Sequence, residues 1–192
     1  MHSKKIYPFK KKLLFTLPLG FIFISWNTDM NRIVWNGSGS ISCTDRSCVT
    51  VGAYNMDGVL LESRQPFTMY SNDLGKTFEK GVQAPLPTKA DLANGAQLAS
   101  VNCINQHCVA VGAYALKADV FNSPQSISGK PIAMTSEDGG RTFHQAYQPI
   151  LPTGGDANLL SHLAGITCNE ENCVGVGQYN FDIANNYGTG LA

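Results

Sequence analysis

Short runs in which apolar residues alternate with small or polar residues recur along the chain. In the run Val109–Tyr114, Val109, Val111 and Ala113 alternate with smaller residues. Runs of this length that are rich in β-branched side chains and separated by glycine-containing turns are typical of β-strands. The pattern therefore predicts an all-β fold.

This run belongs to a segment that occurs three times in the chain. The copies align without gaps, 60 residues apart from Cys43 to Cys103 and 65 residues apart from Cys103 to Cys168. They are CTDRSCVTVGAY (Cys43–Tyr54), CINQHCVAVGAY (Cys103–Tyr114) and CNEENCVGVGQY (Cys168–Tyr179). Self-similarity at a period of this size indicates a repeat architecture.

Each repeat is expected to form four short strands. In the second repeat these are Leu98–Cys103, Val109–Tyr114, Pro131–Thr135 and Thr142–Tyr147. Turns are predicted at Ile104–His107 and Asp138–Gly140, and a variable loop at Ala115–Lys130. Four antiparallel strands per repeat predict the blade of a β-propeller. A β-sandwich is the alternative, but it leaves the repeat unexplained.

Two further segments share the pattern S-x-D-x-G-x-T-F, 65 residues apart. The matching residues are Ser71, Asp73, Gly75, Thr77 and Phe78 in one copy and Ser136, Asp138, Gly140, Thr142 and Phe143 in the other. The pattern resembles the Asp-box, or BNR repeat, of sialidase-like β-propellers. That resemblance implies a turn between the third and fourth strands of a blade, with a structural role away from any active site.

The Asp-box pattern also has a local physical explanation. An aspartate in a tight turn accepts hydrogen bonds from backbone N–H groups ahead of it. Glycine supplies the positive φ that such a turn requires, and the aromatic residue is free to pack between neighbouring sheets. Asp73 and Asp138 are therefore interpreted as turn-stabilising residues and not as catalytic acids.

The six cysteines form three Cys-x4-Cys pairs, one on the first predicted hairpin of each repeat. Flanking positions of such a hairpin lie opposite each other within disulfide range. The predicted disulfides are Cys43–Cys48, Cys103–Cys108 and Cys168–Cys173. Zinc ligation and free buried thiols are the alternatives. Zinc needs four ligands, whereas each pair offers two.

The composition separates the N-terminus from the rest of the chain. There are 14 lysines and arginines and 14 aspartates and glutamates, which gives no net charge. Five of the lysines lie near the start, at Lys4, Lys5, Lys10, Lys11 and Lys12. An apolar stretch follows over residues 13–26. This order predicts a signal peptide over residues 1–26 and a secreted or periplasmic protein. The alternative is a membrane anchor through residues 13–26, if they are not cleaved.

The overall balance of residues excludes several classes of protein. A disordered chain needs high net charge and few apolar residues, whereas 43% of this chain is hydrophobic. A coiled coil would be rich in Glu, Lys and Leu. A nucleic-acid-binding protein would normally show a basic surplus, so no nucleic-acid partner is expected.

No catalytic centre is predicted. The resemblance implies that a sialidase would use three arginines, a Tyr/Glu nucleophile pair and an Asp acid, spread over several blades. The arginines of the chain are Arg32, Arg46, Arg64 and Arg141. Arg46 falls in a hairpin loop and Arg141 in an Asp-box. Arg32 alone precedes Ile-Val, which resembles the family's Arg-Ile-Pro without its proline. His144 and His162 are interpreted as surface or core residues, and neither a metal nor a cofactor is expected.

The repeats divide the chain into blades over residues 27–87, 88–152 and 153–192. A third Asp-box would begin at position 196 to 201 by the spacing of the first two, and the sequence ends at Ala192. We therefore expect two blades and half of a third, a partial propeller that is open as a single chain. Copies of the chain or a partner chain could complete the ring.

The expected function is recognition without catalysis. Loops on a rigid scaffold usually carry function, and the candidate contact loops are Asn55–Gln65 and Ala115–Lys130. Their ligand would be a glycan or a protein. The alternative is a truncated remnant of a sialidase-like glycoside hydrolase that has no activity of its own.

Overall fold

The computed structural model describes six stretches of the chain: residues 37–55, 64–87, 95–118, 127–156, 159–182 and 187–191. Every regular element in these stretches is a β-strand, so the predicted all-β class is confirmed. The same stretches contain no helix that is long and apolar enough to cross a bilayer. The predicted signal segment 1–26 and Arg32 lie outside the described residues.

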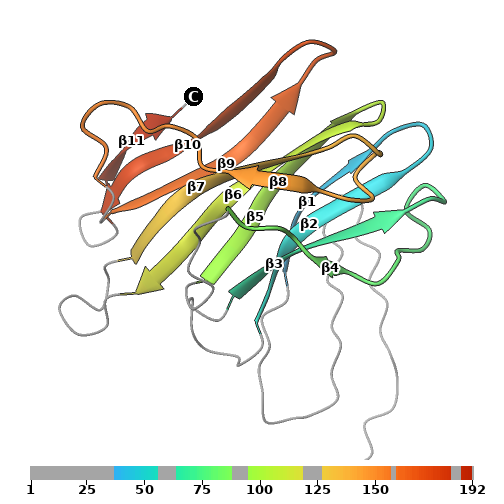
Figure 1. Cartoon of the computed structure of the whole chain (residues 1–192), viewed down its shortest axis with the longest axis horizontal. Helices are drawn as coiled ribbons and strands as arrows, with labels where there is room; N and C mark the ends of the chain where they lie inside the picture. The colour runs from blue at the N-terminus through green and yellow to red at the C-terminus, as the bar shows by residue number, and fades with distance from the viewer. Residues whose placement is uncertain are drawn as a thin grey trace, which may run out of the picture.

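The first repeat forms an antiparallel sheet of four strands in chain order (Figure 1). The strands are β1 (Gly37–Cys43), β2 (Cys48–Asn55), β3 (Arg64–Ser71) and β4 (Val82–Gln83). The second repeat forms an equivalent sheet from β5 (Gly95–Ile104), β6 (His107–Ala118), β7 (Ile127–Ser136) and β8 (His144–Tyr147). The two S-x-D-x-G-x-T-F segments lie between β3 and β4 and between β7 and β8.

The third repeat contributes three described strands. They are β9 (Leu160–Cys168), β10 (Cys173–Asp182) and β11 (Tyr187–Leu191), paired antiparallel. One parallel pair, Gly129 with Leu160, joins β9 to β7. The second and third repeats therefore belong to one seven-stranded sheet, and neither sheet closes on itself within the described stretches.

The sequence repeat is also a repeat of strand register. Val51 lies opposite Ser40, Val111 opposite Ser100, and Val176 opposite Gly165. Immediately beyond each of these pairs the first strand carries one extra residue, which is a β-bulge. The residue after each valine is a glycine, at Gly52, Gly112 and Gly177. The three hairpins are therefore built in the same way.

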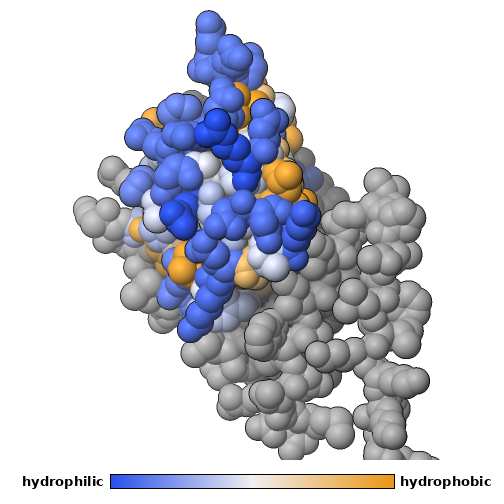
Figure 2. All heavy atoms as spheres, turned by 90° about the vertical axis from the view of Figure 1, so that its right-hand side faces the viewer, coloured by the Kyte–Doolittle hydropathy of each residue, from blue (hydrophilic) through white to orange (hydrophobic). Residues whose placement is uncertain are grey.

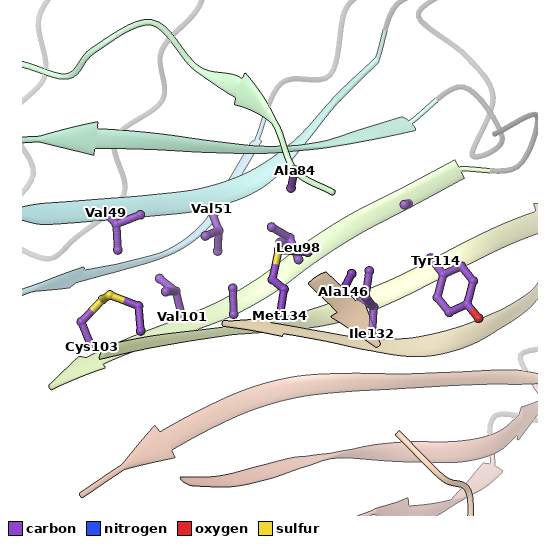
Figure 3. Packing of buried hydrophobic residues seen from close by; sticks show 13 residues of the cluster. Val49, Val51, Ala84, Leu98, Val101, Cys103, Tyr114, Ile132, Met134 and Ala146 are labelled. Carbon is purple, nitrogen blue, oxygen red and sulfur yellow. A yellow bond between two sulfur atoms is a disulfide. The ribbon is translucent and has the colours of Figure 1, made fainter. Parts of the chain in front are cut away.

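The repeats stack face to face, and the hydrophobic core lies between them (Figures 1 and 3). We call the side of each sheet that carries the two valines of its second strand the forward face, and the opposite side the rear face. Val49 and Val51, on the forward face of the first sheet, are 0% exposed and pack with Leu98 and Met134 of the second repeat. Val111, on the forward face of the second repeat, packs with Leu163 of the third.

Several predicted boundaries are wrong. The pairing of β6 with β7 extends to Ala118 and Ile127, so the predicted loop Ala115–Lys130 is too long at both ends. A register shift after Tyr114 breaks the alternation there, which hides the continuation of the strand. The predicted loop Asn55–Gln65 is likewise shortened, because both ends belong to strands. Residues 56–63 and 119–126 lie outside the described stretches.

Two turns also differ from the prediction. The pair Ile104–His107 belongs to the ladder, which leaves a two-residue turn with Asn105 at φ 55°. The fourth strand of the second repeat begins at His144 and not at Thr142, because Thr142 still bonds to the aspartate of the turn. The third repeat was expected to hold only its first hairpin. Strand β11 was missed because its glycines and threonine show no apolar alternation.

Candidate functional site

The disulfides lie at one end of the stacked sheets. Each predicted pair is joined, with Sγ–Sγ distances of 2.08, 2.10 and 2.12 Å for Cys43–Cys48, Cys103–Cys108 and Cys168–Cys173. No cysteine is left as a free thiol. Each bridge closes a short hairpin, for which a stabilisation of about 2 kcal/mol is typical. Disulfides of this number are characteristic of proteins in an oxidising, extracellular-type environment.

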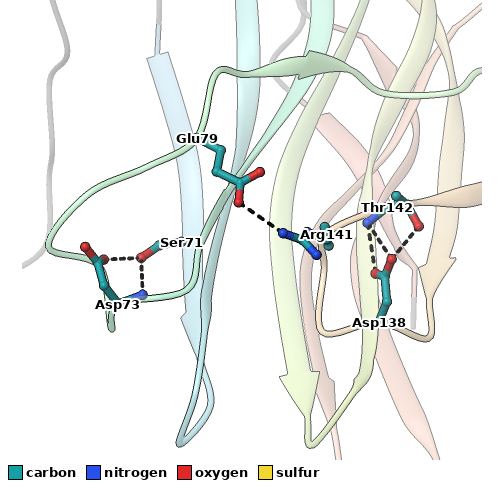
Figure 4. A network of polar contacts seen from close by, with 6 residues as sticks. All are labelled: Ser71, Asp73, Glu79, Asp138, Arg141 and Thr142. Atoms are coloured by element: carbon teal, nitrogen blue, oxygen red, sulfur yellow. Dashed lines mark hydrogen bonds and ion pairs between the residues drawn. The ribbon is translucent and has the colours of Figure 1, made fainter.

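The first S-x-D-x-G-x-T-F turn begins next to the first disulfide, because Ser71 lies opposite Cys48 in the ladder. Asp73 accepts hydrogen bonds from the Ser71 hydroxyl at 2.8 Å, the Thr77 N–H at 2.8 Å and the Thr77 hydroxyl at 2.6 Å. Figure 4 shows the contact between Ser71 and Asp73. The Ser71 hydroxyl in turn accepts the Gly75 N–H at 2.8 Å. Gly75 has a φ of +82°, which glycine adopts without strain.

The second S-x-D-x-G-x-T-F turn repeats this network. Asp138 accepts from the Ser136 hydroxyl at 2.7 Å, the Thr142 N–H at 2.8 Å and the Thr142 hydroxyl at 2.6 Å. Ser136 lies opposite Cys108 and accepts the Gly140 N–H at 3.0 Å. Phe143 packs against the core cluster between the first and second sheets. Both oxygens of each carboxylate are therefore used to hold a turn.

The hydrogen bonds lower the pKa of both carboxyl groups. The hydroxyl and N–H of Thr77 hold the pKa of Asp73 at about 2, below its ordinary value of 3.8. Burial acts to raise the pKa of Asp138, but the bonds from Thr142 and Ser136 together outweigh it and leave that pKa lowered. A carboxyl group that is ionised in this way is poorly suited to donate a proton near neutral pH.

The lowered pKa of Asp73 predicts a loss of stability in acid. Its contribution is present above the unfolded pKa of 3.8 and disappears as the pH falls through the folded value of about 2. We expect the free energy of unfolding, measured by urea denaturation, to fall across this interval. Asp73→Asn should make the fall shallower. Glu170→Gln, in the exposed turn after β9, should leave it unchanged, and an equal effect of the two substitutions would contradict the prediction.

The second S-x-D-x-G-x-T-F turn also contacts the first repeat. Gly140 lies against Val49, since a Cβ at this position would come within 2.7 Å of that side chain. Arg141 donates a 3.4 Å hydrogen bond to Glu79 (Figure 4). It also lies over the Tyr70 ring, 5.4 Å from the ring centroid. Because the Arg141 and Glu79 side chains are 58% and 50% exposed, this ion pair adds little stability. The turn is positioned mainly by packing.

A set of hydrogen bonds that the repeat pattern alone does not predict joins successive repeats. The Cys103 N–H donates to the Ser42 hydroxyl at 2.9 Å, and the Cys168 N–H donates to the Asn102 side-chain carbonyl at 3.0 Å. Ser42 and Asn102 both immediately precede the first cysteine of their repeat, and Thr167 occupies that place in the third. The polar residue at this position in all three copies is the sequence feature from which these hydrogen bonds could have been predicted.

The arginines do not converge on one site in the part of the chain that the structure describes. Arg46 lies in the exposed turn between β1 and β2. Arg64 begins β3 and donates to the Gln97 side chain at 2.7 Å. Arg141 is held in its turn, as described above. No group of three His, Cys, Asp or Glu side chains within these stretches could hold a metal ion.

The histidines are likewise dispersed. His144 is exposed on β8, and His162 is partly buried on β9. Burial lowers the pKa of His162. The disulfide end of the molecule, which faces the viewer in Figure 2, is predominantly hydrophilic.

A comparison with protein-family models finds no match for this chain, and a search of curated proteins also finds none.

Proposed function

We propose that the chain is an Asp-box repeat protein of the sialidase-like β-propeller type, with repeats that correspond to blades. Its function is recognition of a glycan or a protein, without catalysis. The observation that carries the proposal is that the repeated aspartates and cysteines all have structural partners. Both Asp-box carboxylates are occupied in turns and all six cysteines are in disulfides. We therefore expect the connections between strands to bind the ligand.

The proposed contact region lies at the end of the sheets opposite the disulfides. Strand β2 ends at Asn55 and β3 begins at Arg64, and the equivalent ends in the second repeat are Ala118 and Ile127. In Figure 1 these ends point the same way. The strands that flank segments 56–63 and 119–126 therefore belong to two packed sheets. A ligand that spans both segments would be held on a rigid support.

The disulfides support export, and we propose a secreted or periplasmic location with residues 1–26 as a signal peptide. N-terminal sequencing of the mature protein, isolated from the medium or periplasm, should show that residues 1–26 have been removed. Recovery of the intact N-terminus in the membrane fraction would instead support an anchor through residues 13–26.

Binding can be tested on the disulfide-intact protein with a glycan array and with immobilised extracellular proteins. We expect binding that is lost when residues 119–126 are replaced by a Gly-Ser linker. Replacement of Glu170 and Glu171 by serine, at the disulfide end, is the matched control and should leave binding unchanged. Loss of binding in the control alone would show that the ligand binds at the disulfide end, which would contradict the proposed contact region. If the protein binds none of the glycans or proteins tested, the result would favour an inactive remnant. Release of sialic acid from a sialoside by this chain would contradict the non-catalytic role.

A further inference from the structure

We draw no further inference here: the strongest candidate, the partly exposed rear face of the first sheet around Tyr54 and Phe67, is an apolar sheet face, and nothing in the structure shows what covers it.

Discussion

Replacing Gly112 with alanine should lower the free energy of unfolding by about 3 kcal/mol or more. A Cβ at this position would lie 2.0 Å from the Gln97 carbonyl oxygen and 2.8 Å from the Leu98 Cα. Both are backbone atoms of β5, which the adjacent bulge brings close to β6. A backbone in a paired strand cannot rotate aside as the end of a side chain can, so the ladder has to open. Urea denaturation followed by circular dichroism measures the loss.

The repeat supplies a second site and a matched control. Gly177→Ala should be as damaging, because its Cβ would lie 2.0 Å from the His162 carbonyl oxygen. Gly175, on the same strand, would place a Cβ no closer than 3.5 Å to any neighbour, and only side-chain atoms lie that near. Gly175→Ala should change stability by about 0.5 kcal/mol or less. If Gly112→Ala were as stable as the unmodified protein, the bulged register would be wrong.

Val49→Asp should lower the free energy of unfolding by about 4 kcal/mol or more, and so unfold the packed sheets. Val49 is fully buried between the first and second sheets, in a cluster that includes Leu98, Val101 and Met134. An ionised carboxylate placed there would lose its hydration among apolar side chains. Thermal unfolding and the yield of soluble protein are the measurements.

The control for this substitution is Val82→Asp. Val82 lies on the edge strand β4 and is 55% exposed, so the same chemical change should alter stability by about 0.5 kcal/mol or less. Equal losses for the two variants would mean that the first and second sheets do not pack through Val49.

The features that could be predicted from the sequence are those fixed by neighbouring residues. A Cys-x4-Cys spacing determines which cysteines can meet across one hairpin, and the three disulfides follow this rule. The hydrogen bonds of Asp73 join residues no more than four positions apart. The alternation in Val109–Tyr114 is enough to show a strand. None of these features depends on where the next sheet lies.

The features that were missed depend on contacts between repeats or on irregular backbone. The β-bulge opposite Gly112 and the register shift after Tyr114 interrupt the alternation that defines a strand. The bond from Cys103 to Ser42 joins residues 61 positions apart. Val49 and Val174 occupy the same place in the repeat, yet one is 0% and the other 53% exposed. Only the arrangement of the sheets decides which valine is core.

The identity of a ligand is the property that the sequence predicts least. The proposed contact segments, 56–63 and 119–126, differ in sequence from each other while the sheets that carry them repeat. Specificity in such a protein comes from loop residues and their shape, whereas repeated residues such as Ser71 and Ser136 serve the scaffold. The repeat therefore predicts the sheets that carry the contact segments, whereas it does not predict the bound molecule.

The stacking of like repeats is tested most directly by native-state hydrogen exchange, followed by NMR, at the amides of Cys103 and Cys168. These amides donate to Ser42 and Asn102 of the preceding repeat, at 2.9 and 3.0 Å. If the repeats are docked in this way, both amides should be protected as strongly as those inside β6, and Ser42→Ala should speed exchange at Cys103 while leaving Cys168 unchanged. Exchange of both amides in the unmodified protein at the rate of an unfolded chain would contradict the stacked arrangement.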